Sequence, residues 1–260
     1  MKRKILLLFI LFPFVFFGYS CNYPQQFSIL RKPPTDFFVK IYKELQITRC
    51  SKKPVAPGMK ACETKTFYST GSGLVVKISG IHTVVLTAGH VCTTEGLREE
   101  DSQYRYSWTD TIRALDRNKL FHQSHVILSS PATDKSSDLC TLFVPSMKYF
   151  EKEPTTTIAR RGPKIGEDVY YIGAPQGIYH PPTALIVRGV FSGEIDKFSS
   201  LISAPSAGGA SGSVILSSNN QIFGVLFAVH PSFKHATVIT NFAQTRKFLN
   251  ETRKLLIRQK

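Results

Sequence analysis

The sequence is short of acidic residues and of repeated segments. It has 18 Asp and Glu residues against 33 Lys and Arg residues, which gives a formal net charge of +15 at pH 7. No internal repeat or low-complexity tract is present, so neither feature favours a fibrous or repeat architecture. The 260 residues, of which 42% are hydrophobic and 20% charged, suffice for one large domain or two small ones with a buried core.

Long hydrophobic runs are also missing. The apolar run over residues 5–17 has 13 residues, which is short of the roughly 20 that span a membrane. Because it follows a basic start and precedes the small residues Gly18 and Ser20, it predicts an export signal over residues 1–20. Cys21, just beyond, is a candidate for lipidation. An uncleaved membrane anchor is the alternative.

The basic residues form no stripe with interleaved aromatics, as a nucleic-acid binder would require. They are scattered, with local clusters at 52–53, at 160–161 and after residue 245. We expect these residues to form a solvated surface, and one interpretation places that surface close to an anionic membrane or cell envelope. No specific nucleic acid is expected as a partner. Nucleic-acid or surface binding by the C-terminal segment is a separate hypothesis, which predicts steeply salt-dependent binding.

Cysteine is sparse, with five residues in the chain. Cys50 and Cys62 bracket a Pro- and Gly-containing loop, which a crosslink would tie, and export would permit the disulfide. We predict that bridge. Cys92 and Cys140 lie in apolar segments, where cysteine is usually a small buried hydrophobe. A bridge between these two is geometrically conceivable, and the sequence leaves it open.

Helical periodicity is almost absent between residues 67 and 240. Ten short strand-like runs punctuated by Gly, Pro, Ser and Asn fill this region and predict an all-β barrel or sandwich. One short helix is predicted within "TDFFVKIYKELQ", where Phe37, Phe38, Ile41 and Leu45 share a helical face. A second helix is expected over 241–258, with Asn241 as its N-cap, packed back onto the barrels or, alternatively, lying on a membrane surface.

Phosphate-binding and metal-binding patterns are weak. "YIGAPQGIYHPP" lacks the lysine and the following helix of a P-loop. His122 and His125 are three residues apart in a strand-like segment without further ligands, which favours surface residues over a metal site. We expect no metal and no cofactor.

Three segments carry chemistry. In "GGASGS" the glycines free the backbone to bend and to expose its amides, which favours Ser211 as a nucleophile with the amides of Gly209 and Ser211 as oxyanion donors. A serine hydroxyl needs a base, and the base needs a carboxylate that fixes its tautomer. His90, at a strand end in "TAGHVC", and Asp138, opening "DLCTL", supply both in the order His, Asp, Ser.

These segments, together with "GSGLVV", "YYIGAPQG", "VRGVFSG" and "IFGVLFA", resemble the trypsin-like (chymotrypsin-fold) serine peptidases over about 67–249, especially the bacterial HtrA-type and glutamyl-endopeptidase-like branches. The resemblance implies two packed six-stranded antiparallel β-barrels with the active site between them, followed here by the C-terminal α-helix. It also implies that His90 is the general base, Asp138 its orienting carboxylate and Ser211 the nucleophile.

The resemblance also places a specificity pocket. Its floor is expected at Pro205 and its wall at Phe227, Ala228 and Val229. No acid is present there to attract Lys or Arg, so we expect an apolar or small side chain, unless His230 or His235 points inward. Ala210 replaces the aspartate with which digestive members pair a new N-terminus, so that activation switch is not expected, and no PDZ domain is expected after the barrels.

The sequence therefore predicts a signal peptide over 1–20, an N-terminal extension over 21–65 and a peptidase domain over 66–260, with barrels at about 66–150 and 160–240. The predicted protein is an exported serine endopeptidase, periplasmic, envelope-associated or secreted, that forms an acyl-enzyme on Ser211. Its expected partners are protein or peptide substrates and, through the signal or a lipid on Cys21, a membrane. The alternative is a catalytically inactive binding or scaffold module of the same fold at the cell envelope.

Overall fold

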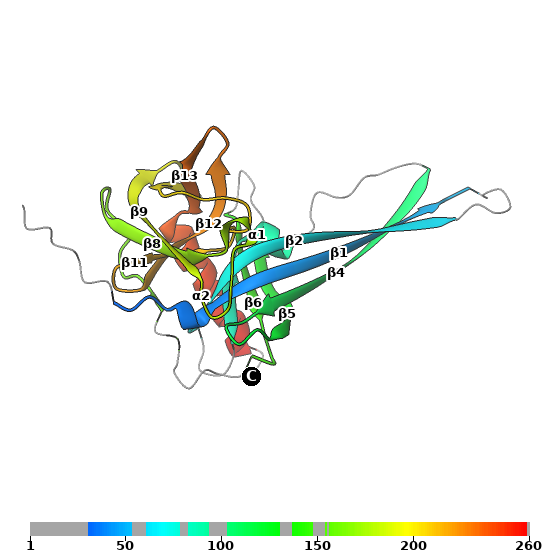
Figure 1. The fold of residues 1–260 in the computed structure, drawn as a ribbon, viewed down its shortest axis with the longest axis horizontal. Helices are drawn as coiled ribbons and strands as arrows, with labels where there is room; N and C mark the ends of the chain where they lie inside the picture. The colour runs from blue at the N-terminus through cyan, green and yellow to red at the C-terminus, as the bar shows by residue number, and fades with distance from the viewer. Residues whose placement is uncertain are drawn as a thin grey trace, which may run out of the picture.

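The structure is a computed structural model that describes residues 31–53, 61–78, 83–93, 103–130, 137–147, 154 and 156–258. Within these ranges the chain forms two β-barrels side by side and one long helix at the end (Figure 1). The predicted signal segment 1–20 and Cys21 lie outside the described residues.

Six strands form the first barrel, with α1 (Gly89–Cys92) following its third strand. The barrel closes in the order β1-β2-β3-β6-β5-β4. Its interior is filled by alternating apolar side chains such as Val85 and Leu142, both fully buried. The strands are β1 (Phe38–Ser51), β2 (Cys62–Val76), β3 (Val84–Thr87), β4 (Tyr104–Leu115), β5 (Phe121–Ser130) and β6 (Leu139–Phe143), with the 3₁₀ turn η1 (Thr35–Phe37) before them.

The second barrel closes in the order β11-β8-β9-β10-β13-β12, because β11 also pairs with β12. β7 adds a short parallel strand to β12. Two six-stranded antiparallel barrels confirm the predicted all-β, chymotrypsin-like architecture. The elements are β7 (Thr157–Ile158), β8 (Asp168–Gly173), η2 (Pro175–Gly177), β9 (Leu185–Glu194), β10 (Ser199–Ser203), β11 (Val214–Ser217), β12 (Gln221–His230) and β13 (Phe233–Thr240).

The predicted helix within "TDFFVKIYKELQ" is wrong, because these residues belong mainly to strand β1. β1 pairs with β2 on one side and β4 on the other, so it is a central strand of the first barrel. Residues 38–41 are all buried, whichever face their side chains take. A strand buried on both faces loses its alternation, and its apolar spacing then resembles that of a helix. The first barrel therefore begins before residue 66.

Three strands continue beyond the first barrel as a projecting sheet. β3 pairs with β2 only from Leu74 onward, and β5 pairs with β4 only from Ile112 onward. The remaining parts, residues 46–51 of β1, 62–70 of β2 and 104–110 of β4, extend away from the body (Figure 1). We call this sheet the arm. Near its tip Cys50 and Cys62 are register partners and form the predicted disulfide.

Helix α2 (Phe242–Arg258) packs against both barrels. Its buried face includes Phe248, Leu249 and Leu256, which join a hydrophobic cluster formed by residues of both barrels. The Thr252 hydroxyl is also 3.2 Å from that of Thr141 in β6. This packing agrees with the first of the two expected positions. Among the described residues, no helix combines the length and the apolar character needed to cross a membrane.

Asn241 caps α2 as predicted, since its side-chain Oδ1 accepts the Ala243 amide at 2.8 Å. We expect Asn241→Ala to lower the free energy of unfolding by about 1 kcal/mol, because one helix amide loses its acceptor. Urea unfolding followed by circular dichroism measures the change. Asn241→Asp keeps the acceptor and should retain most of the stability. Equal losses in both variants would contradict the capping role.

Candidate active site

His90 and Asp138 form one unit at the end of the first barrel. The His90 amide donates to Asp138 Oδ1 at 2.7 Å, and His90 Nδ1 is hydrogen-bonded to Asp138 Oδ2. The carboxylate is buried, with 1% of the residue exposed, whereas the His90 side chain is 48% exposed. A buried carboxylate that holds the ring in this way fixes its orientation and tautomer and leaves Nε2 toward solvent.

The small residues of "TAGH" are explained by this close approach. A Cβ on Gly89 would lie 2.6 Å from Asp138 Oδ1 and 2.6 Å from the Ser130 carbonyl oxygen. Glycine is therefore required at position 89, because any side chain would push the carboxylate away from the histidine.

A disulfide joins Cys92 in α1 to Cys140 in β6. The two cysteines follow His90 and Asp138 by two residues each, so the crosslink ties together the segments that carry the pair. The sequence left this connection open. The tertiary structure decides it by bringing α1 against β6.

Ser211 lies in the loop between β10 and β11, which docks on the first barrel. Its carbonyl oxygen accepts the Ser72 amide at 2.7 Å. The next residue, Gly212, has φ +91°, and a Cβ there would lie 2.1 Å from Ser72 O and 3.1 Å from the Ala88 nitrogen. Ser211 is therefore brought to the end of β3 that leads into His90.

Ser211 and His90 are not directly hydrogen-bonded to each other in the described part of the chain. Among the contacts between described residues, no hydrogen bond links the Ser211 hydroxyl to the His90 ring. Such contacts are often long in free enzymes and tighten when substrate binds.

The loop also leaves amides for an oxyanion. The Gly209 carbonyl accepts the Ser72 hydroxyl at 2.8 Å, and the Gly208 carbonyl accepts the Gln176 amide at 2.7 Å. Both carbonyls are thus held by the protein. Within the described part of the chain, the amides of Gly209 and Ser211 donate to no acceptor. The amide of a serine and that of the residue two positions before it, both without an acceptor, are the arrangement that stabilises a tetrahedral oxyanion.

Ser72 is a positioning residue that the sequence analysis missed. It is fully buried, and its hydroxyl joins the Gly209 carbonyl to the Ala174 amide, the latter at 3.0 Å. Its carbonyl accepts the Thr87 hydroxyl at 2.8 Å. Its amide also donates a hydrogen bond to the Ser211 carbonyl. Ser72 therefore connects β2, β3, the segment before η2 and the serine loop. The only signal was its place between two glycines in "GSGLVV".

Two buried lysines of β1 support neighbouring loops. Lys40 Nζ donates to the Gly177 carbonyl at 2.8 Å, and Lys43 Nζ donates to the Thr93 carbonyl, directly after α1, at 2.6 Å. Desolvation lowers the pKa of Lys43, and the charge of Asp110 opposes that shift. Both lysines lie in the segment 21–65 that the sequence pattern predicts as an extension outside the peptidase domain, and the structure places them in the first barrel.

The predicted pocket residues lie together in the second barrel. The exposed Pro205 has its carbonyl held by the Tyr171 hydroxyl at 2.6 Å. Thr237, the register partner of Val229, donates to the Ala204 carbonyl at 2.7 Å and so connects the expected floor to the expected wall.

The expected wall is part of β12. Phe227, Ala228 and Val229 are half-buried, and they follow the last pairing of β12 with β11 at Val225. His230 and His235 are both exposed near the β12–β13 turn.

The prediction that His122 and His125 are both surface residues is wrong for His122. His122 is buried, with Nε2 3.0 Å from Asp116 Oδ2 and Nδ1 3.1 Å from the Ser146 hydroxyl. His125 is exposed. No group of three or more potential metal ligands occurs among the described residues. The chain thus holds a second Asp–His–Ser set, which ties β5 to the turn after β6.

A sequence profile described as a trypsin-like peptidase domain matches residues 71–225, which is more than half of the chain. The chain belongs to the trypsin-like peptidase family. The matched segment contains His90, Asp138 and Ser211. A search of curated protein sequences finds no match.

Solved structures of proteases share the fold. One is the Rv3671c protease of M. tuberculosis in its active form, with 16% identity, a TM-score of 0.53, and coverage of 80% of this chain and 79% of that one. Another is the serine endoprotease of Yersinia pestis, with 16% identity, a TM-score of 0.51, and coverage of 80% of this chain and 62% of that one. At this identity the likeness concerns the fold, which agrees with a serine peptidase.

We expect Ser72→Ala to lower kcat by about ten- to a hundredfold, because the Gly209 carbonyl of the serine loop and the buried Ala174 amide both lose their hydrogen bond to the Ser72 hydroxyl, at a cost of roughly 1–3 kcal/mol. Steady-state kinetics on an unfolded protein substrate measures it. Ser192→Ala, which removes an exposed hydroxyl paired with Ser203, is the matched control and should leave kcat unchanged. A normal kcat in Ser72→Ala would refute the positioning role.

Burial raises the pKa of Tyr171 to about 12. Between its usual value near 10 and that raised value, the unfolded chain releases this proton and the folded chain keeps it, so stability falls as pH rises. From pH 8 to 11 the wild type should therefore lose about 1.4 kcal/mol more than Tyr171→Phe. Urea unfolding at both pH values measures the difference. Tyr68→Phe, at an exposed tyrosine, should lose as much as the wild type.

Proposed function

We propose that this peptidase hydrolyses peptide bonds through a triad of Ser211, His90 and Asp138. The observation that carries the proposal is the buried Asp138 carboxylate, which holds both the amide and the ring of His90. The serine loop, which is hydrogen-bonded to the first barrel and leaves the amides of Gly209 and Ser211 without an acceptor among the described residues, supports the same assignment.

In this mechanism His90 Nε2 takes the proton of the Ser211 hydroxyl while Oγ attacks the substrate carbonyl carbon. The oxyanion that forms accepts hydrogen bonds from the backbone amides of Gly209 and Ser211. His90 then gives its proton to the leaving amine as the C–N bond breaks, which leaves an acyl group on Ser211. A water molecule then attacks the acyl carbon as His90 takes its proton, and His90 returns that proton to Ser211 Oγ as the ester bond breaks and the carboxylic acid leaves. Asp138 remains ionised and stabilises the imidazolium.

The substrate is an extended polypeptide cut internally, since clefts of this kind bind peptides as added strands. The half-buried Phe227, Ala228 and Val229 beside Pro205 support a preference for an apolar or small side chain before the scissile bond. Two disulfides support an exported enzyme, because disulfides persist in oxidising compartments. The signal segment 1–20 and a lipid on Cys21 would place it at a cell envelope.

Fluorophosphonate labelling of the purified full chain tests the assignment. The wild type should be labelled, and Ser211→Ala and His90→Ala should lose labelling. Asp138→Asn should keep the fold and lower kcat by about 10⁴, because the wrong histidine tautomer is then held.

Ser146→Ala is the matched control, since Ser146 also contacts a histidine that contacts an aspartate. It should label like the wild type. Labelling that survives Ser211→Ala and disappears in Ser146→Ala would move the nucleophile to the second set. A folded wild type without labelling would indicate an inactive binding module of the same fold.

A further inference from the structure

The arm offers a long unpaired strand edge that begins at the active site. β2 pairs with β1 along its whole length on one side. On its other side, among the described residues, the first strand partner of β2 is β3 at Leu74. Residues 62–70 therefore present a free edge, and all of them are exposed. Ser72, which binds the Ser211 carbonyl, belongs to the same strand.

The backbone groups on this edge can be assigned from strand geometry. The Ser72 amide and carbonyl point away from β1, because they bind Ser211 and Thr87. Backbone direction repeats every second residue in a strand. The amides and carbonyls that face the free edge are therefore those of Thr70, Tyr68, Thr66 and Thr64.

The disulfide supports this parity. Cys62 lies an even number of residues before Ser72, so its amide and carbonyl also point away from β1. Cys50 and Cys62 should therefore be a non-hydrogen-bonded pair, whose Cα atoms lie about 4.5 Å apart. Their Cα–Cα separation is 4.1 Å. The crosslink sits at the far end of the free edge and fixes its register with β1.

The two faces of the arm differ in chemistry. By register, one face carries the apolar and aromatic side chains Ile47, Phe67, Tyr104, Tyr106 and Trp108. The opposite face is mostly polar, with Gln46, Thr48, Thr64, Thr66, Ser107 and Thr109, and it also carries Tyr68 and Arg105. Phe67 and Trp108 are 52% and 44% exposed, so the aromatic face has no cover from the described part of the chain.

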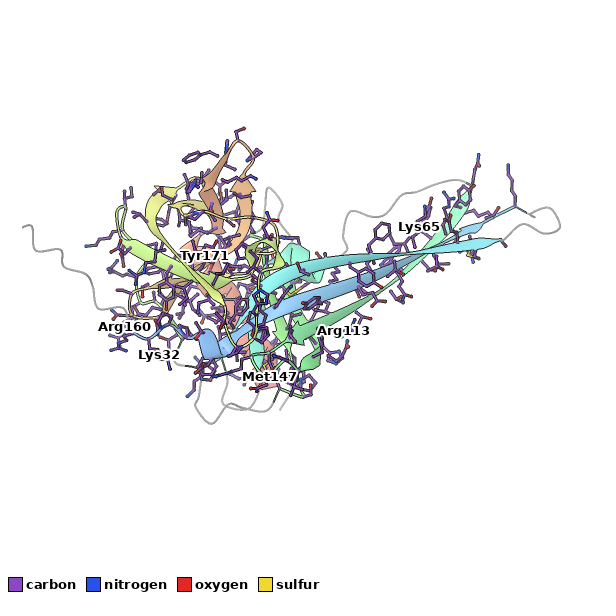
Figure 2. The ribbon with its side chains drawn as sticks, viewed as in Figure 1. Lys32, Lys65, Arg113, Met147, Arg160 and Tyr171 are labelled. Carbon is purple, nitrogen blue, oxygen red and sulfur yellow. A yellow bond between two sulfur atoms is a disulfide. The ribbon has the colours of Figure 1, made fainter. Side chains whose placement is uncertain are left out.

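A shallow groove runs along the aromatic face. It is lined by Ile47, Arg49, Glu63, Lys65, Phe67 and Tyr106. Figure 2 shows Lys65 toward the outer end of the arm and Arg113 near its base, so this groove lies well away from the body of the molecule. A side chain that projected from a strand added to β2 onto this face would meet Phe67 or Lys65 first.

We propose that the free edge of β2 binds the leaving-group side of an extended, unfolded polypeptide as an added antiparallel strand. The inference rests on the proposed function, because the pocket for the preceding side chain is placed in the second barrel. A chain that enters over that pocket and passes Ser211 leaves over β2, toward the tip of the arm. The eight steps along the strand from Ser72 to Thr64 span about 27 Å at roughly 3.4 Å per residue.

The continuity of β2 with the serine loop favours substrate over other occupants of the edge. The strand that holds the nucleophile's carbonyl continues without interruption into the free edge, so both bind one polypeptide in a single register. The enzyme should then prefer substrates with many residues after the scissile bond and with an apolar or aromatic side chain opposite Phe67.

Thr66→Pro tests the edge with little disturbance of the arm. The Thr66 amide faces the free edge, so proline there removes an outward donor and no bond to β1. Thr66→Ala loses the same side chain and keeps the amide, which makes it the matched control. In the Ser211→Ala background, fluorescein-labelled unfolded casein should bind at least tenfold more weakly to Thr66→Pro than to Thr66→Ala, by fluorescence anisotropy.

Kinetics in the active chain give the second readout. Two peptides share one cleavage sequence mapped in casein and carry three or ten residues after the scissile bond. The wild type and Thr66→Ala should show at least tenfold higher kcat/KM for the long peptide. Thr66→Pro should lose that preference, cleave the short peptide normally and label with fluorophosphonate normally.

The two proposals fail in different ways. Loss of labelling at Ser211 refutes the proposed catalysis, and casein binding to the Ser211→Ala chains still tests the arm. Normal labelling with equal kcat/KM for both peptides, or equal casein binding to the two Thr66 variants, refutes the arm proposal. A wild type that sediments as a dimer and becomes monomeric in Thr66→Pro would assign the edge to a second copy and also refute it.

Discussion

The active site depends on one buried hydroxyl that fastens two barrels together. The proposed triad takes groups from both, since His90 and Asp138 come from the first barrel and Ser211 from the second. Ser72 is fully buried, and its polar atoms bind Gly209, Ala174, Thr87 and Ser211. Because buried polar groups are costly to leave unpaired, this set of bonds holds the serine loop at a defined position on the first barrel.

Buried charge has the same effect within the first barrel. The Asp138 carboxylate is removed from water, and His90 compensates it with both its amide and its ring. Lys40 and Lys43 are also largely buried and end on the carbonyls of Gly177 and Thr93. A buried charge tolerates few alternative partners, so these side chains restrict the loops around the site to one arrangement.

The arm extends this organisation beyond the barrels. A long exposed strand edge is a liability for a soluble protein, because it invites pairing with any other extended chain. Here the edge is continuous with the strand that binds the Ser211 loop, and the disulfide near its tip fixes its register. An enzyme whose substrates are extended chains can use such an edge, and the aromatic groove beside it adds side-chain selection to backbone pairing.

The sequence by itself determined the class of fold and predicted the residues that we propose carry the chemistry. Period-two runs define strands locally, and glycines that permit close approach mark the His90 and Ser211 turns through short-range sterics. The tertiary structure alone decided that residues 38–51 form a central strand, that Cys92 joins Cys140, and that Ser72, Lys40 and Lys43 support the site. Each of these depends on contacts between residues far apart in the chain. Local pattern carries no information about such partners, because burial on both faces of a strand hides its alternation, and a buried lysine or serine looks in sequence like an exposed one.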